Sequence, residues 1–112
     1  MEDFVQLGLT NGDSSQNGRS ISIFLESVDA KGFDFRKRVQ AKFSISVKDQ
    51  ITGAHHKKTS TSSWFTAASY TLGWPAFMRR SELKDPKKGF LVGNCCFVEA
   101  DVSVLGVVND LT

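Results

Sequence analysis

Residues 39–47 read VQAKFSISV, and this stretch decides the fold class. Apolar Phe43, Ile45 and Val47 occupy every second position, with a serine between each pair. Successive side chains of a strand point to opposite faces of a sheet, so the pattern predicts a strand with one buried and one solvated face. The same two-residue period recurs in three further stretches, residues 5–9, 20–27 and 98–104.

The alternation is lost over residues 67–73, and we expect a short helix after it. Pro75 suits the first position of a helix, and residues 76–83 can form one or two turns before Pro86, which a helix does not run through cheaply. The chain thus combines five or six strands with one short helical insert, and strands do not alternate with long helices. These features predict an all-β fold, an antiparallel β-sandwich.

The length and composition indicate one globular domain over residues 1–112. The chain is 40% hydrophobic and 23% charged, which is usual for a globular protein. Its formal net charge of +2 is small, which argues against a dedicated nucleic-acid binder. Nine Phe beside one Tyr indicate a packed apolar interior or an apolar contact surface. The sequence has no run of about 20 apolar residues, so we expect no membrane span.

The cysteine pattern bears on the compartment. Cys95 and Cys96 are adjacent, and neighbouring residues of a strand point to opposite faces, so they are not expected to pair with each other. The sequence shows no secretory signal at its start. Unpaired thiols persist in reducing compartments, and the prediction is therefore a cytoplasmic or nuclear protein.

Few residues could support catalysis or metal binding. His55 and His56 are the only histidines, and neighbours in a strand diverge, so they would chelate a metal poorly. Cys95 has no adjacent base in the sequence to activate it. Glu99 and Asp101, about 7 Å apart on one strand face, could act as an acid–base pair but fit a solvated strand face better. We expect no enzymatic activity, no cofactor and no metal site.

Basic residues gather in four clusters: Arg36-Lys37-Arg38, Lys57-Lys58, Arg79-Arg80 and Lys87-Lys88. If folding brought them together, they would form an electrostatic surface for acidic lipid or nucleic acid. The simpler interpretation is that they confer solubility and protect strand edges from unwanted pairing. We favour the second interpretation and keep the first as an alternative function.

Aromatic side chains indicate a contact surface. Phe24 lies on the otherwise polar face of its predicted strand, so its ring is either covered internally or offered to a partner. Trp64, Tyr70 and Trp74 follow near irregular structure. Aromatic anchors with a polar surround supply much of the binding energy of protein interfaces. The alternative is that these rings cover the ends of the sandwich.

The second half of the chain carries a series of motifs that resembles a known family. The motifs are Trp64-Phe65, Gly73-Trp74-Pro75, Phe77-Met78, Ser81-Glu82-Leu83, Asp85-Pro86, Gly89-Phe90-Leu91-Val92 and the strand VEADVSV at 98–104. This series resembles the MATH (meprin/TRAF homology, TRAF-C-like) domain, in the form common in plants. The stretches at 20–25 and 41–47 resemble two further strands of the family, so the likeness covers roughly residues 3–108.

The resemblance implies a fold and a function. Family members are antiparallel β-sandwiches that bind short extended peptide segments of other proteins in a shallow groove, as adaptors or scaffolds. The positions of this chain that match the groove elements are Phe24, Ala41, Trp64, Tyr70, Thr71, Leu72, Gly73 and Trp74. Leu72 departs from the aromatic residue usual at its position, and Trp74 replaces a frequent Phe, so peptide specificity does not transfer.

The resemblance also implies that the domain is incomplete at its N-terminus, because the family opens with two strands that have no counterpart before residue 3. Missing strands leave sheet edges unpaired, and unpaired edges invite association. We therefore expect the chain to be less stable than a complete domain or to self-associate. A structural paralogue without a working groove is the remaining alternative.

Overall fold

The computed structural model describes the backbone of residues 6–10 and the whole of residues 19–110. The elements in chain order are β1 (Gln6–Thr10), β2 (Ser20–Glu26), the 3₁₀ turn η2 (Ala30–Gly32), β3 (Lys37–Val47), β4 (His56–Thr59), β5 (Ser63–Phe65), β6 (Thr71–Arg79), α1 (Arg80–Leu83) and β7 (Val98–Asn109).

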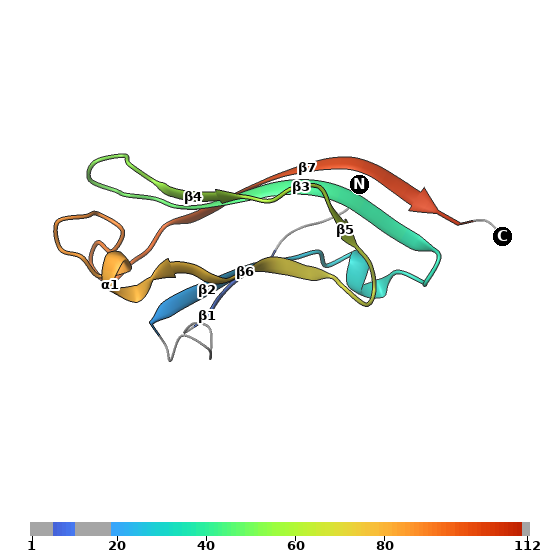
Figure 1. Ribbon diagram of the computed structural model, residues 1–112, viewed down its shortest axis with the longest axis horizontal. Coiled ribbons are helices and arrows are strands. Elements are labelled where there is room, and N and C mark those ends of the chain that lie inside the picture. Colours follow the sequence, from blue (N-terminus) through green and yellow to red (C-terminus); the bar gives the residue numbers. More distant parts are fainter. Residues whose placement is uncertain (1–5, 11–18, 111–112) are drawn as a thin grey trace.

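The strands form two antiparallel sheets that lie one above the other (Figure 1). Sheet A has the strand order β1-β2-β6, so β6 is one of its edges. In sheet B, β3 pairs with β7 along its whole length, and β4 and β5 therefore share the other side of β3. The prediction of an all-β antiparallel sandwich with a short helix is confirmed.

The core lies between the two sheets, and β3 supplies its centre. The inward-facing residues of β3 are all buried, and these are Val39, Ala41, Phe43, Ile45 and Val47. The last four of them pack in one apolar cluster with Ile23 and Leu25 of β2 and with Phe65 and Phe77. Burial of an apolar side chain of this size stabilises the fold by about 1.5–3 kcal/mol, so the alternation in 39–47 accounts directly for the sandwich.

The helix predicted over residues 76–83 is wrong in its extent. Residues 71–79 form the strand β6, and α1 is a single turn at Arg80–Leu83. Pro75 lies inside β6 because the pairing of β6 with β2 shifts there, between Ile21 and Ile23, so the missing N–H interrupts no regular ladder. The Ser22 hydroxyl donates a hydrogen bond to the Pro75 carbonyl oxygen at this irregularity.

Candidate functional site

The strand β6 offers an edge for a ligand. It pairs with β2 on one side, and among the described strands none pairs with its other side. Leu72 and Trp74 lie opposite Leu25 and Ile23 of β2, and both side chains pack against the core between the sheets. Trp74 contacts the rings of Phe43 and Phe77 edge-on, with centroids 5.5 and 5.7 Å apart. The apolar side of this edge is therefore held in place by the core.

The main chain of β6 presents hydrogen-bonding groups at this edge. The Ser27 N–H donates to the Tyr70 carbonyl oxygen at 2.8 Å. Bonded and non-bonded residue pairs alternate in an antiparallel ladder, so Leu72 bonds β2 while Thr71 and Gly73 do not. The N–H and C=O groups of Thr71 and Gly73 consequently point outward, away from β2.

Gly73 brings the backbones of β6 and β2 unusually close. Phe24 lies directly opposite it, and a Cβ atom at position 73 would come 2.6 Å from Phe24 Cα and overlap the Ile23 carbonyl oxygen. Only glycine fits this approach. The half-buried Phe24 ring is on the face of β2 opposite to the core, so it flanks the outward groups of Gly73.

The other half of the β6 edge is already occupied by β4 of the opposite sheet. His56 Nε2 lies 3.0 Å from the Phe77 carbonyl oxygen, and Lys58 Nζ donates to the Ala76 carbonyl oxygen at 3.2 Å. Both side chains leave β4 on the same face because they are two residues apart. The open part of the edge is therefore confined to residues 70–74.

The structure brings only part of the predicted groove together. Phe24 and residues 70–74 lie side by side on sheet A. Ala41 is completely buried in the core, so its side chain offers no surface to a ligand. Trp64 of β5 lies opposite Gln40 of β3. Its neighbour Phe65 points inward and is buried, so the Trp64 side chain lies on the outer face of sheet B. Trp64 is therefore separated from Phe24 by the thickness of the sandwich.

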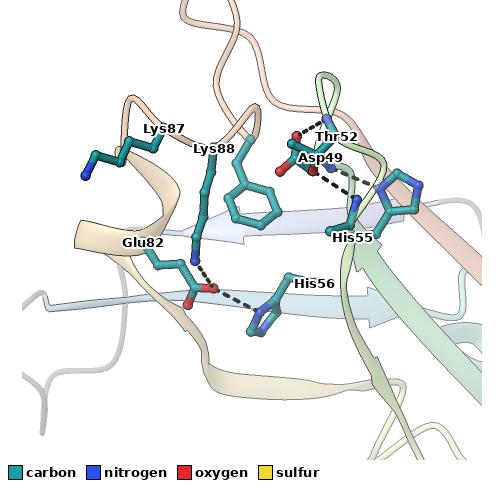
Figure 2. Close-up of a pocket in the computed structure, with 9 residues that line it drawn as sticks. Asp49, Thr52, His55, His56, Glu82, Lys87 and Lys88 are labelled. Atoms are coloured by element: carbon teal, nitrogen blue, oxygen red, sulfur yellow. Dashed lines mark hydrogen bonds and ion pairs between the residues drawn. The ribbon is translucent and has the colours of Figure 1, made fainter.

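A pocket with a volume of 430 Å³ lies at the α1 end of the molecule, away from residues 70–74 (Figure 2). The Glu82 carboxylate accepts a hydrogen bond from Lys88 Nζ at 3.3 Å and lies 3.7 Å from His56 Nδ1. Figure 2 shows Glu82 between these two side chains, with Lys87 pointing away. His56 thus contacts both β6 and Glu82. Its role is structural, and it joins β4 of sheet B to β6 of sheet A.

Asp49 organises the loops around the same pocket. Its Oδ1 accepts hydrogen bonds from the N–H groups of Ile51, Thr52 and Gly89 at 3.0, 2.9 and 3.0 Å. These donors stabilise the carboxylate, the Thr52 N–H foremost, and they lower the pKa of Asp49 to about 2. A Cβ on Gly89 would lie 2.6 Å from Asp49 Oδ1, so glycine is needed beside this carboxylate.

Several members of the basic clusters have partners within the chain. Arg36 pairs with Asp34 at 3.0 Å and Lys88 with Glu82 at 3.3 Å. The Arg38 guanidinium lies 5.0 Å from the Trp64 ring centroid. Within residues 6–10 and 19–110, no group of three or more His, Cys, Asp or Glu side chains could hold a metal ion. The same residues contain no helix long and apolar enough to cross a membrane.

Comparison with known proteins places the chain in a family. The profile of the MATH domain matches residues 7–102. Ubiquitin C-terminal hydrolases 12 and 13 of Arabidopsis thaliana are 34% and 29% identical to it over 89 residues, which are 80% of this chain and 8% of each hydrolase. The MATH domain and coiled-coil domain-containing protein At3g27040 of the same plant is 32% identical over 66% of this chain and 27% of its own length. The chain thus spans under a tenth of either hydrolase. It belongs to the MATH domain family, a family of protein-interaction modules.

Proposed function

We propose that this chain binds a short extended segment of a partner protein along the open edge of β6 at residues 70–74. The outward N–H and C=O groups of Thr71 and Gly73 carry the proposal. They are the groups that an added strand needs, and they lie on an edge that the described strands leave open. Addition of a peptide strand to a sheet edge is a common mode of recognition.

The bound segment would be short. Thr71 and Gly73 offer two donors and two acceptors, and Pro75 contributes no N–H beyond them. His56 and Lys58 occupy the carbonyl groups that follow. An added strand can therefore form a regular ladder over about four or five residues. Each main-chain hydrogen bond stabilises the complex by about 0.5–1.5 kcal/mol net, so side chains must supply the remaining affinity.

Two apolar surfaces flank the added strand and would receive its alternating side chains. On the outer face of sheet A, the segment would contact Phe24. On the inner side, it would contact the exposed parts of Leu72 and Trp74, which are half-buried at the rim of the core. A segment with apolar residues on both faces fits this environment best. Ala41 and Trp64, predicted from the resemblance, are not part of the proposed site.

The arrangement favours this function over an electrostatic one. Two basic side chains close to this part of β6 are already engaged, since Lys58 binds the Ala76 carbonyl oxygen and Lys31 lies 5.7 Å from the Tyr70 ring centroid. Two relatives are named as ubiquitin C-terminal hydrolases, and this chain corresponds to 8% of each. We infer that the chain supplies adaptor-type recognition and not hydrolysis. Its free thiols at Cys95 and Cys96 favour work in the cytoplasm or nucleus.

A peptide library displayed on phage, followed by measurement of Kd for a selected peptide, tests the proposal. Thr71→Pro removes one outward N–H at the first residue of β6 and leaves the β2 pairing intact. Thr71→Val is the matched control, because it keeps that N–H. We expect Thr71→Pro to weaken binding by about fivefold to tenfold and Thr71→Val to leave Kd nearly unchanged. Equal affinity of the two variants would contradict an added strand at this edge.

A further inference from the structure

Glu26 is a half-buried carboxylate on the outer face of sheet A, close to the edge at which a peptide is proposed to bind. It follows the buried Leu25 in β2, so it lies on the same face as Phe24. The register places Glu26 opposite Thr71 and Phe24 opposite Gly73. The two β6 residues whose main-chain groups point outward therefore each have a different β2 side chain behind them, one acidic and one aromatic.

The Glu26 carboxylate has no counter-ion among the described side chains, since none of their ion pairs involves it. Its neighbours across the sheet, Gln6 of β1 and Thr71 of β6, are uncharged residues. Lys31 contacts the same end of β6, but it lies over the Tyr70 ring, which packs on the core-facing side of the sheet. Glu26 thus places an uncompensated negative charge on the outer face beside the peptide site.

No bulky side chain of β6 separates these two β2 residues from a ligand strand. Gly73 has no side chain, and Thr71 has a short one. A strand paired with β6 lies two strand spacings from β2, which is about 9–10 Å. An apolar ligand side chain opposite Gly73 can therefore contact the Phe24 ring. A long ligand side chain opposite Thr71 can extend over the threonine to the Glu26 carboxylate.

We propose that Glu26 makes the site selective for a segment that has a basic residue two positions after an apolar one. This selectivity rests on the proposed function, because it requires a strand paired with Thr71 and Gly73. Directly opposed residues of an antiparallel pair have their side chains on the same face. The ligand residue opposite Gly73 is therefore the apolar one. The residue opposite Thr71 is two positions nearer the ligand C-terminus and faces Glu26.

The ligand residue between these two faces the opposite side. It lies opposite Leu72, at the apolar rim of the core, so an apolar side chain suits it as well. The recognised order is thus apolar, apolar, basic, read toward the C-terminus. Arg fits the last position best, because its guanidinium binds a carboxylate through two parallel hydrogen bonds. The order follows from antiparallel addition, which all pairings among the described strands share and which is the more stable per residue.

Selection from the phage library on the wild-type chain and on Glu26→Lys tests this preference. We expect wild-type selections to be enriched in Arg or Lys two positions after an apolar residue, and Glu26→Lys selections to be enriched in Asp or Glu there. For one peptide selected on wild type, Glu26→Gln should raise Kd by about twofold to fivefold. Added salt should reduce this difference.

Asp101→Lys is the matched control, because it makes the same change in net charge at an exposed position on sheet B. It should leave the Kd of the selected peptide nearly unchanged. The urea midpoint of each variant checks that the fold is kept.

The role of Glu26 is overturned if wild type and Glu26→Lys select the same residue types at this position, or if Glu26→Gln binds the peptide as tightly as wild type. It is overturned equally if Asp101→Lys weakens binding as much as Glu26→Lys, because net charge alone then explains the effect. Peptides that bind Thr71→Pro as well as Thr71→Val, or a library that yields no peptide, would overturn the proposed function as well. Absence of the basic preference alone leaves the added strand at β6 in place.

Discussion

Phe43 joins the core to the proposed binding edge, and its truncation is the most informative single change. The side chain is 3% exposed and lies at the centre of β3. Its ring centroid is 6.1 Å from that of Phe65 and 5.5 Å from that of Trp74. Phe43→Ala therefore removes a ring that supports both the sandwich and the inner side of the β6 edge.

The expected loss follows from the burial. Replacement of a fully buried Phe by Ala costs about 3–5 kcal/mol, because apolar burial is lost and a cavity is left. Total stability of a domain of this size is about 5–15 kcal/mol, so the loss is a large share of it. Phe43→Leu keeps most of the volume and loses the ring contacts, and it should cost about 1–2 kcal/mol.

Urea unfolding followed by tryptophan fluorescence measures these losses. With an m-value of about 1.5 kcal/mol/M, Phe43→Ala should lower the midpoint by roughly 2–3 M. Phe35→Ala is the matched control, since Phe35 is 92% exposed, and it should change stability by no more than about 0.5 kcal/mol. If Phe43→Ala costs no more than Phe35→Ala, the proposed packing of the core is wrong.

Three further perturbations test separate features. The folded-state pKa of Asp49, about 2, lies below its ordinary value of 3.8, so its contribution to stability is complete above about pH 4 and disappears toward pH 2. Asp49→Asn should therefore make the melting temperature depend less on pH between about pH 4 and pH 2. If the pH dependence of the melting temperature were unchanged, the stabilising role of the Asp49 carboxylate would be refuted. Gly73→Val should destabilise the chain by about 1–3 kcal/mol and abolish peptide binding, because its Cβ overlaps the β2 backbone; Gly32→Ala, which has open space around it, should do neither. His56→Ala should lower the free energy of unfolding, measured in urea, by about 1–2 kcal/mol through loss of the contact with the Phe77 carbonyl oxygen. An unchanged free energy of unfolding would show that this contact does not stabilise the β6 edge.

Much of the fold could be predicted because it rests on local alternation. The VQAKFSISV stretch became the centre of sheet B with its inward side as expected. Pro75 could not be placed correctly, because its tolerance depends on a register shift against β2, which lies some 50 residues earlier in the chain. Without knowledge of the pairing between β6 and β2, Pro75 is more readily interpreted as the first residue of a helix than as part of a strand.

The structure also brings the predicted binding site together only in part, because some of its residues lie together and others do not. Residues 70–74 and Phe24 were predicted together, and they lie side by side across the ladder. Ala41 and Trp64 were included through the resemblance, and pairing determines which face each side chain takes. The contacts of His56 and Lys58 with β6 join the two sheets, and a sequence read strand by strand does not reveal them.

Amide hydrogen exchange at Thr71 and Gly73 tests the central claim most directly. NMR would follow both amides with and without a peptide selected from the library. Main-chain pairing at the β6 edge predicts that both amides exchange much more slowly in the complex, while the Gln40 and Trp64 amides on sheet B do not change. Slower exchange confined to β5, with Thr71 and Gly73 unchanged, would contradict the claim and move the site to the other face.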